Sequence, residues 1–365
     1  MSMRGLVRST IKLLPLYNTH SYRPGQLRLK ASPQASEAFR GVGYLHKGTL
    51  RRLEMALYYL VIMPLAAFLP ARLAYNLACR RADLLYLWDV PKRKRVLRCL
   101  EMVLGDQLSR GELERVARDH FRVRSCEVVD VMRLAGKGQA LARLVEMRGL
   151  EHIEAALAAG KGAILCSAHF GSYDGCFSLL GIRGYPITVV GRWPSKSDGD
   201  RSSLECFLFR QTYQKPVAHH RHRPNIEPRP GQIGTAVQAA NVLRQNELLS
   251  ILLDPPVLPA DRARAVQVNF LNGRALLLPG AVTLAQLTGA PVLMVFMRRS
   301  ADWGHQILEI SPPVSMDGDA ETAFERCLAV VENAIRQNPA HWRYWNITPL
   351  VQLGLLPREA MEDLV

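Results

Sequence analysis

The sequence of 365 residues lacks the short motifs that identify several large enzyme classes. It contains no Gly-x4-Gly-Lys-Ser/Thr, no Gly-x-Gly-x-x-Gly after a strand, no Gly-x-Ser-x-Gly and no His-Glu-x-x-His. P-loop NTPases, dinucleotide enzymes, α/β-hydrolases and zinc proteases need these motifs to hold a phosphate, a nucleophile or a metal ion. Their absence argues against all of these classes.

Paired cysteines are also missing. The seven cysteines are scattered along the chain and include no Cys-x-x-Cys pair. A disulfide framework, a zinc ribbon and a thioredoxin motif are therefore poorly supported. We expect reduced thiols in a chain that faces the cytosol.

Acidic residues are scarce relative to basic ones. The chain has 32 Asp and Glu residues against 47 Lys and Arg residues, which gives a formal net charge of +15. Such a balance favours anionic partners, namely phospholipid headgroups, nucleic acid or an acidic carrier protein. The sequence has no recognisable nucleic-acid-binding module and no basic patch with interleaved aromatic residues, so nucleic acid is not an expected partner.

A hydrophobic run long enough to span a bilayer is absent as well. The fifteen uncharged residues from Met55 to Leu69 would form a helix of about 22 Å. The hydrocarbon core of a bilayer is about 30 Å thick. Basic residues flank the run, so we expect a helix at residues 53–70 that lies in an anionic membrane interface. Residues 1–48 carry many basic residues and only one acidic residue, which predicts a flexible basic arm.

The rest of the chain predicts an α/β fold. Short apolar runs typical of strands occur at 162–168, 186–190, 248–253, 291–297 and 305–310, and helical patterns occur at 151–159, 174–182, 233–246, 278–288 and 320–337. This alternation predicts a central, mostly parallel or mixed sheet flanked by helices. The expected divisions are the arm at 1–48, a helical region at 49–148, an α/β domain at 149–350, a tail at 351–365 and a proline-rich surface loop at 215–233.

The pattern that carries chemistry is His169-Phe-Gly171-Ser172-Tyr-Asp174, an H-x4-D arrangement directly after an expected strand. Loops at the carboxyl ends of strands are where α/β sheets build their sites. A helix that starts near Ser172 would place Asp174 in its first turn, where the carboxylate can fold back onto His169. The imidazole would then take a proton from a hydroxyl that attacks a thioester, and N–H groups around Gly171 would hold the oxyanion. A purely structural histidine, satisfied by a helix-capping carboxylate, is the alternative.

The surroundings of this motif resemble the bacterial lipid A late acyltransferase family, the lauroyl and myristoyl transferases, which includes the phosphatidylinositol mannoside acyltransferases. The resemblance covers residues 50–350. Besides the H-x4-D motif, the matching stretches are Val190-Gly-Arg-Trp-Pro194, Leu252-Leu-Asp254-Pro255, Phe270-Leu-Asn-Gly273, the segment from Gly280 to Arg298, and the segment from Ile335 to Trp345.

The resemblance implies that an acyl chain passes from acyl carrier protein or acyl-CoA to a hydroxyl of a membrane lipid. It implies a peripheral or monotopic protein at the cytoplasmic face of the inner membrane, with no bound metal ion or cofactor. His169 would be the general base and Asp174 its partner. Together with Gly171, the residues expected to bind substrate are Arg192, Arg210, Asp254, Asn272, Gly273 and Arg298.

Departures from the family pattern leave the acceptor open. Lipid A enzymes usually have Glu at the position of Asp174 and Gln at the position of Pro255, and the 215–233 loop resembles an insertion.

Two alternative functions are a catalytically silent lipid-binding protein of the same fold and an acyltransferase that acts on a small soluble metabolite. Two less favoured sites are a metal site at His219, His220 and His222 and a nucleophilic cysteine at Cys166 or Cys176.

Overall fold

The computed structural model describes residues 61, 65, 68–191, 203–228 and 234–356. The basic arm at 1–48, most of the expected helix at 53–70, Arg192 and most of the expected tail lie outside the described residues. Within the described part of the chain, no helix combines the length and the apolar character that crossing a bilayer requires.

The described chain starts with helices and continues as alternating strands and helices. The elements up to β3 are α4 (Ala71–Trp88), α5 (Val90–Leu104), α6 (Arg110–Ala142), β1 (Val145–Arg148), α7 (Leu150–Ala158), β2 (Ala163–Ser167), α8 (Tyr173–Ile182) and β3 (Ile187–Val190). Then come α9 (Ser203–Phe209), a π-helical turn (Arg210–Gln214), α10 (Lys215–His219), α11 (Gly234–Arg244), β4 (Leu248–Leu252), a 3₁₀ turn (Pro259–Arg264), β5 (Val266–Phe270) and β6 (Gly273–Leu277). The chain ends with α12 (Gly280–Thr288), β7 (Val292–Arg299), β8 (Gln306–Val314), α13 (Ala320–Gln337), a 3₁₀ turn (Pro339–His341) and α14 (Ile347–Leu353).

The described strands form a six-stranded sheet in the order β1-β8-β7-β2-β4-β3 and a separate β5–β6 hairpin. All neighbours in the large sheet are parallel except β7 and β8, which are antiparallel. The predicted fold class, a mostly parallel or mixed sheet flanked by helices, is confirmed. Strand β1 is a correction, because it lies inside the stretch that we expected to be helical, and the hairpin was not foreseen.

Two apolar cores lie on the two faces of the sheet, and β2 shows how the sequence builds both. Its five residues are all buried. Ile164 and Cys166 belong to one core, whereas Ala163 and Leu165 belong to the other, as the two-residue period of a strand requires. A strand covered on both faces is apolar at nearly every position, which explains the near-continuous apolar run that identified it.

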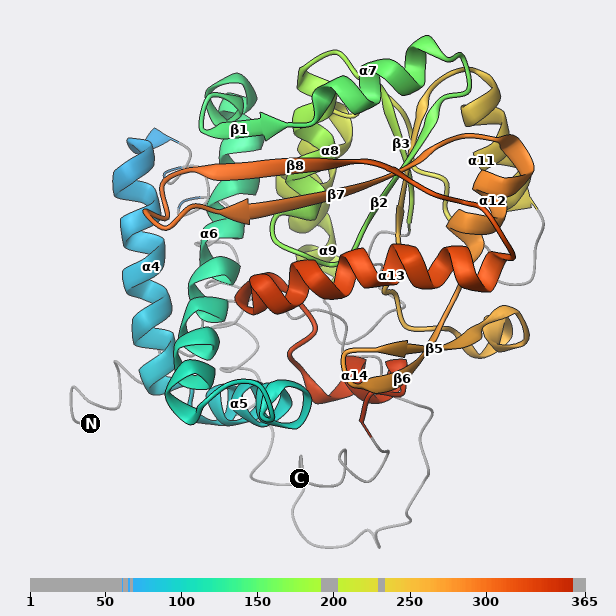
Figure 1. The fold of residues 1–365 in the computed structure, drawn as a ribbon. Coiled ribbons are helices and arrows are strands. Elements are labelled where there is room, and N and C mark those ends of the chain that lie inside the picture. Colours follow the sequence, from blue (N-terminus) through green and yellow to red (C-terminus); the bar gives the residue numbers. More distant parts are fainter. Residues whose placement is uncertain (1–60, 62–64, 66–67, 192–202, 229–233, 357–365) are drawn as a thin grey trace, which may run out of the picture.

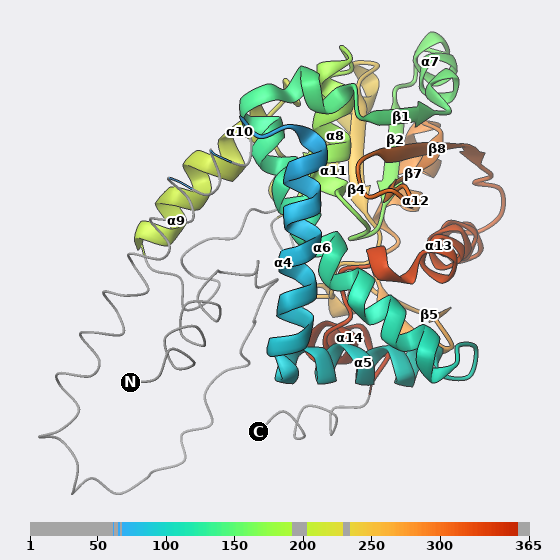
Figure 2. The ribbon, with the colours of Figure 1, turned by 90° about the vertical axis from the view of Figure 1, so that its left-hand side faces the viewer.

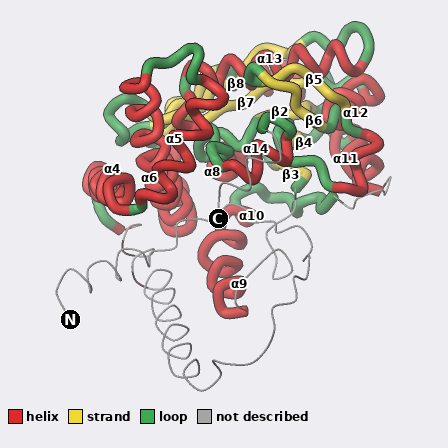
Figure 3. The backbone as a smooth tube through the Cα atoms, turned by 90° about the horizontal axis from the view of Figure 1, so that it is seen from below, coloured by secondary structure: helices red, strands yellow, loops and turns green. Residues whose placement is uncertain are grey.

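Helices cover both faces of the sheet. Residues of α11, α12 and α13 pack in the core that contains Ile164, and α13 crosses in front of the sheet in Figure 1. Residues of α7, α8 and the second half of α6 pack in the other core. The helical layer of α4, α5 and α6 stands beside this arrangement (Figures 1 and 2). Figure 3 shows the same helices from below, at the left, with the strands to their right.

Helix α6 begins with a capping box at Ser109. The side-chain oxygen of Ser109 accepts a hydrogen bond from the backbone N–H of Glu112, and the Glu112 carboxylate accepts one from the backbone N–H of Ser109. This reciprocal capping box satisfies two N–H groups that the first turn of a helix leaves free.

The described part of the expected 215–233 surface loop, residues 215–228, contains a short helix and buried side chains. It begins with α10, and Arg221 is only 1% exposed. The chain passes so close to α8 that a Cβ atom on Gly181 would lie 1.8 Å from the carbonyl oxygen of His220. Prolines marked a break in the alternation correctly, but they did not indicate that Arg221 and Ile226, which follow α10, are buried.

Candidate active site after strands β2 and β4

His169 and Asp254 lie side by side because of the register between two parallel strands. Strands β2 and β4 are neighbours, and Ser167 at the end of β2 pairs with Leu252 at the end of β4. His169 and Asp254 each come two residues after those positions. The backbone N–H of Leu253 donates to the carbonyl oxygen of Ser167 at 2.8 Å, which continues the register beyond the strands. The site thus forms at the carboxyl edge of the sheet, where such sites are expected.

The carboxylate of Asp254 holds both the backbone and the ring of His169. Its two oxygens accept the backbone N–H of His169 at 3.0 and 2.9 Å, and Oδ1 lies 2.8 Å from Nδ1 of the imidazole. The indole N–H of Trp342 donates to Oδ2 at 2.9 Å. Asp254 is 0% exposed, so all of its partners are protein groups. An ionised carboxylate only accepts hydrogen bonds, so it keeps the proton of the neutral imidazole on Nδ1 and leaves the lone pair on Nε2.

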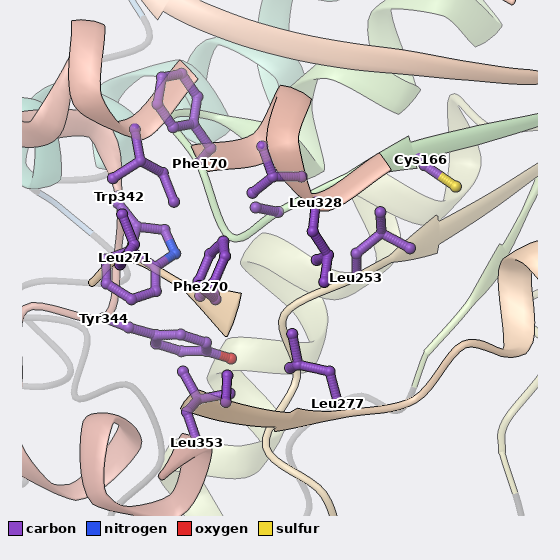
Figure 4. Packing of buried hydrophobic residues seen from close by; sticks show 14 of the residues in the cluster. Cys166, Phe170, Leu253, Phe270, Leu271, Leu277, Leu328, Trp342, Tyr344 and Leu353 are labelled. Atoms are coloured by element: carbon purple, nitrogen blue, oxygen red, sulfur yellow. The ribbon is translucent and has the colours of Figure 1, made fainter. Parts of the chain in front are cut away.

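A segment from the end of the chain completes the site. Residues after α13 return to the loop after β2, where Phe170 and Trp342 form an antiparallel bridge. The backbone N–H of Arg343 donates to the carbonyl oxygen of His169 at 2.8 Å. The same segment brings the hydroxyl of Tyr344 to 3.2 Å from Nε2 of His169, with the two rings 4.6 Å apart. Figure 4 shows Trp342 and Tyr344 among the buried apolar residues beside the site.

Asp174 starts α8 as predicted, but it does not contact His169. Its carboxylate oxygen Oδ1 pairs with Nη2 of Arg221 at 3.0 Å. The side chain of Arg221 is 1% exposed, whereas that of Asp174 is 18% exposed. The expected contact of Asp174 with His169 is therefore a correction. Asp254 bonds Nδ1 of His169 instead, and Asp174 holds the buried Arg221, which follows α10, at the first turn of α8.

The backbone conformation and a close contact explain why residue 171 is a glycine. Its φ angle is +54°, and a Cβ atom there would lie 1.9 Å from the carbonyl oxygen of Met297. Only glycine fits both conditions. The N–H of Gly171 donates to the carbonyl oxygen of His341 at 2.9 Å, so the expected role of this N–H as an oxyanion donor is a further correction.

A small cavity lies beside the start of α8. It has about 20 Å³ of free volume, room for about one water molecule. Its lining residues are Arg124, Glu127, Val128, Val131, Gly171, Ser172, Tyr173, Asp174 and Arg343. Arg343 donates to the hydroxyl of Tyr173 at 2.9 Å and also lies 3.4 Å from the carboxylate of Glu127. An acyl chain needs a groove much larger than this cavity, and an apolar groove beside His169 stays a prediction.

Comparison with known proteins places this site within a family. Residues 46–346 match the family described as bacterial lipid A biosynthesis acyltransferase. The chain belongs to this family. It is also 28% identical over 220 residues to a lipid A biosynthesis acyltransferase of Haemophilus influenzae, an alignment that covers 60% of this chain. The aligned part is 61% of the relative, so the chain spans about three-fifths of the length of the curated relative that it matches.

The family resemblance that the sequence indicated is thus confirmed. His169, Asp254, Trp342 and Tyr344 all lie inside the range that matches the lipid A acyltransferase family. The comparisons leave the roles of individual residues untested, so these roles are argued below from geometry.

Several residues that the family resemblance implied in substrate binding have structural partners. Arg298 on β7 pairs with Glu309 on β8 at 3.1 Å. Asn272 lies with Leu271 in the tight turn between β5 and β6, where both residues have positive φ angles. Its side chain accepts a hydrogen bond from Arg336 at 2.7 Å, and Gly273 follows it at the start of β6. Arg210 is exposed in the π-helical turn, and a role for any of these residues in substrate binding stays a prediction.

The two less favoured sites find no support. Within the described ranges, no group of three or more His, Cys, Asp or Glu side chains has the arrangement of a metal site, and the ring of His220 bonds the carbonyl oxygen of Leu134 at 2.9 Å. Cys166 and Cys176 are both buried, and burial raises the pKa of each thiol well above its usual value. Neither thiol is therefore suited to form the thiolate that a nucleophilic mechanism needs.

Sequence reasoning missed Tyr344 as a site residue and Arg221 as the partner of Asp174. A signal for Tyr344 existed, because Trp342 and Trp345 were recognised as part of a family pattern at the end of the chain. No signal pointed to Arg221, which lies in a proline-rich stretch that resembled a solvent-exposed loop. The pairing of His169 with Asp254 was the feature of the site most accessible from the sequence, because each residue lies two positions after the end of a strand.

Proposed function

We propose that the protein is an O-acyltransferase that moves a fatty acyl chain from a thioester to a hydroxyl of a membrane lipid or glycolipid, with His169 as the general base. The observation that carries this proposal is the buried Asp254 carboxylate on Nδ1 of His169, at 2.8 Å. This arrangement leaves Nε2 as a proton acceptor beside a ring that is 13% exposed. General-base assistance of this kind contributes about 10²–10⁴-fold to a rate.

The reaction balances with His169 as the only proton carrier. The acceptor hydroxyl oxygen bonds to the thioester carbonyl carbon while its proton moves to Nε2. The tetrahedral intermediate then collapses, the C–S bond breaks, and the leaving thiolate takes the proton from Nε2. Asp254 stabilises the imidazolium between these steps, because its negative charge lies next to Nδ1. The products are an ester and a free thiol, and His169 returns to its starting state.

The donor in this proposal is an acyl thioester of acyl carrier protein or of coenzyme A. The name of the family supports acyl transfer to a lipid. The net charge of +15 supports a donor or acceptor that carries negative charge. No bound metal ion or cofactor takes part in the proposed steps.

The outer face of α4 is the surface that we assign to the membrane. Its exposed apolar side chains are Leu73, Leu77, Leu84, Leu87 and Trp88, with exposed fractions from 45% to 56%. Arg72 and Arg80 are exposed on the same helix. An amphipathic helix with apolar and basic residues on one exposed face is suited to the interface of an anionic bilayer. We extend this to a peripheral or monotopic position at the cytoplasmic face of the inner membrane.

The test of the proposed function is acyl transfer by the purified, detergent-extracted protein. The reaction mixture holds acyl-CoA and acyl carrier protein donors and a total lipid extract, and mass spectrometry detects a lipid that gains an acyl increment. We expect this product with the wild type and its loss with His169→Ala. Equal product from both proteins, or no product from the wild type, would contradict the proposal. Free fatty acid alone would indicate a thioesterase instead.

A further inference from the structure

Acyl transfer places a negative charge on the thioester carbonyl oxygen, and this oxygen needs a hydrogen-bond donor. Removal of one such donor from an enzyme of this type costs about 10²–10³-fold in kcat. Backbone N–H groups next to the catalytic residue are the usual donors, so the three N–H groups from His169 to Gly171 are the first candidates.

All three of these N–H groups are already engaged. The N–H of His169 donates to Asp254, that of Phe170 to the carbonyl oxygen of Ala168 at 2.7 Å, and that of Gly171 to the carbonyl oxygen of His341 at 2.9 Å. The N–H groups at the start of α8 adjoin the small cavity lined by residues 171–174, and neither His169 nor Tyr344 lines that cavity. Side chains near Nε2 are therefore the next candidates for the donor.

The hydroxyl of Tyr344 is such a candidate. It lies 3.2 Å from Nε2 of His169, on the nitrogen that faces the reaction. Tyr344 is 3% exposed, and burial together with the charge of Asp254 raises its pKa well above the usual value. The phenol thus keeps its proton and acts as a donor over the working pH range. The other tyrosine beside His169, Tyr173, has its hydroxyl bound by Arg343.

We propose that the Tyr344 hydroxyl is a catalytic hydrogen-bond donor that stabilises the oxyanion of the tetrahedral intermediate. This inference rests on the proposed function and adds a residue to it. Without substrate, the hydroxyl donates to the lone pair of Nε2. When the acceptor hydroxyl takes that lone pair, the O–H of Tyr344 turns to the neighbouring thioester carbonyl oxygen. No covalent bond to Tyr344 forms, and its proton stays on the phenol oxygen throughout.

The packing around Tyr344 supports a fixed donor. Its ring lies near Trp342, with the ring centres 5.8 Å apart, and it belongs to the apolar core beside the site (Figure 4). The backbone pairing of the same segment with the loop after β2 fixes its distance from His169. A donor that is held in place before the reaction stabilises a developing charge without the cost of reorganisation.

The test compares wild type, Tyr344→Phe and His169→Ala in the acyl-transfer assay with dodecanoyl-CoA or dodecanoyl acyl carrier protein, whichever donor the wild type uses. We expect Tyr344→Phe to lower kcat by about 10²–10³-fold with little change in KM. Tyr75→Phe is the matched control, because Tyr75 is also buried but bonds Asp130 in the helical layer. The control should lower stability and keep the wild-type kcat.

A sulfur analogue separates oxyanion stabilisation from a structural role. In a dithioester donor, sulfur replaces the carbonyl oxygen and accepts hydrogen bonds poorly. The wild type should lose much of its rate with this donor, whereas the loss should be far smaller for Tyr344→Phe. If that variant fails to fold, 3-fluorotyrosine at position 344 keeps the hydroxyl and makes it a stronger donor, and we then expect a higher kcat at unchanged KM.

The outcomes distinguish the role of Tyr344 from the proposed acyl-transfer function on which it rests. Wild-type turnover that disappears in His169→Ala but persists at the full rate in Tyr344→Phe overturns only the role of Tyr344. An equal sulfur effect in wild type and Tyr344→Phe, or an unchanged kcat with 3-fluorotyrosine, overturns it as well. Absence of wild-type turnover with either donor contradicts the proposed function itself.

Discussion

His341, which lies beside the proposed active site, should make the stability of the fold depend on pH. Its side chain is buried, and its Nε2 accepts the backbone N–H of Arg299 at 2.9 Å. Burial and the charge of Arg299 lower its pKa to about 3, from a usual value of 6.5. The unfolded chain therefore binds a proton at this residue below pH 6.5, whereas the folded chain does so only near pH 3. Stability should fall as the pH decreases through this interval, because the unfolded state binds more protons.

We predict that His341→Gln makes this loss of stability less steep. The glutamine oxygen can replace Nε2 as an acceptor and does not titrate in this range. The measurement is the free energy of unfolding of both proteins in urea at several pH values between 6.5 and 4. Parallel curves for the two proteins would show that His341 contributes nothing. His120 is also buried with a lowered pKa, so the variant should reduce the slope without removing it.

Residue-scale chemistry was only partly predictable from the sequence. His169 was identified because it follows an apolar run and precedes a glycine. The expected contact of Asp174 with the His169 ring was wrong, because spacing along the chain does not reveal which carboxylate faces a ring. Strand pairing decides this, since Asp254 lies 85 residues away along the chain and enters the site through the register of β4 with β2.

At the scale of elements, a buried polar network joins the helical layer to the sheet. Asp130 on α6 accepts hydrogen bonds from Tyr75 on α4 at 2.7 Å and from Gln306 on β8 at 3.1 Å. It also pairs with Arg299 on β7, whose side chain is 3% exposed. The network couples α4 to β7, the strand that lies next to β2 in the sheet.

We predict that Asp130→Asn lowers the free energy of unfolding by about 3–5 kcal/mol, because it leaves the buried charge of Arg299 without its counter-charge. Denaturant titration measures this change. The control on the same helix is Glu114→Gln, which removes an exposed pair with Arg110 and should cost about 1 kcal/mol or less. Losses of similar size in the two variants would contradict the structural role assigned to the network.

Some of the strands were predictable from the sequence, and others were not. Mostly apolar runs located β2, β3, β4 and β7, and a stretch that alternates apolar and polar residues located β8. Strands β1, β5 and β6 were missed, because polar or charged residues such as Glu146, Gln267 and Arg274 interrupt them. Two residues with positive φ form the β5–β6 turn, and neither is glycine, so the usual hairpin signal was absent.

At the scale of the whole molecule, excess positive charge and an exposed apolar helix face favour the same partner. We predict that Arg72→Gln with Arg80→Gln weakens binding to anionic vesicles by about 2 kcal/mol, roughly thirty-fold, because each base near the surface contributes about 1 kcal/mol. Vesicle flotation or sedimentation measures the binding. The difference should shrink at high salt, which screens the attraction.

A control with the same change in net charge tests whether α4 itself is the contact. Arg244 and Arg262 are exposed on α11 and in the turn before β5, across the molecule from α4 in Figure 1. Arg244→Gln with Arg262→Gln should leave vesicle binding nearly unchanged. Equal weakening by both double variants would attribute the binding to net charge rather than to the face of α4.

The central claim is that Asp254, rather than Asp174, serves His169 in catalysis. Its most direct test is the acyl-transfer rate of Asp254→Asn against that of Asp174→Asn, with the folded state of each variant checked by its melting temperature. We predict that Asp254→Asn lowers kcat by about 10²–10⁴-fold, because the amide cannot balance an imidazolium. Asp174→Asn should act mainly through stability, because it breaks the ion pair with Arg221. A folded Asp174→Asn protein that has lost activity, beside an active Asp254→Asn protein, would contradict the account.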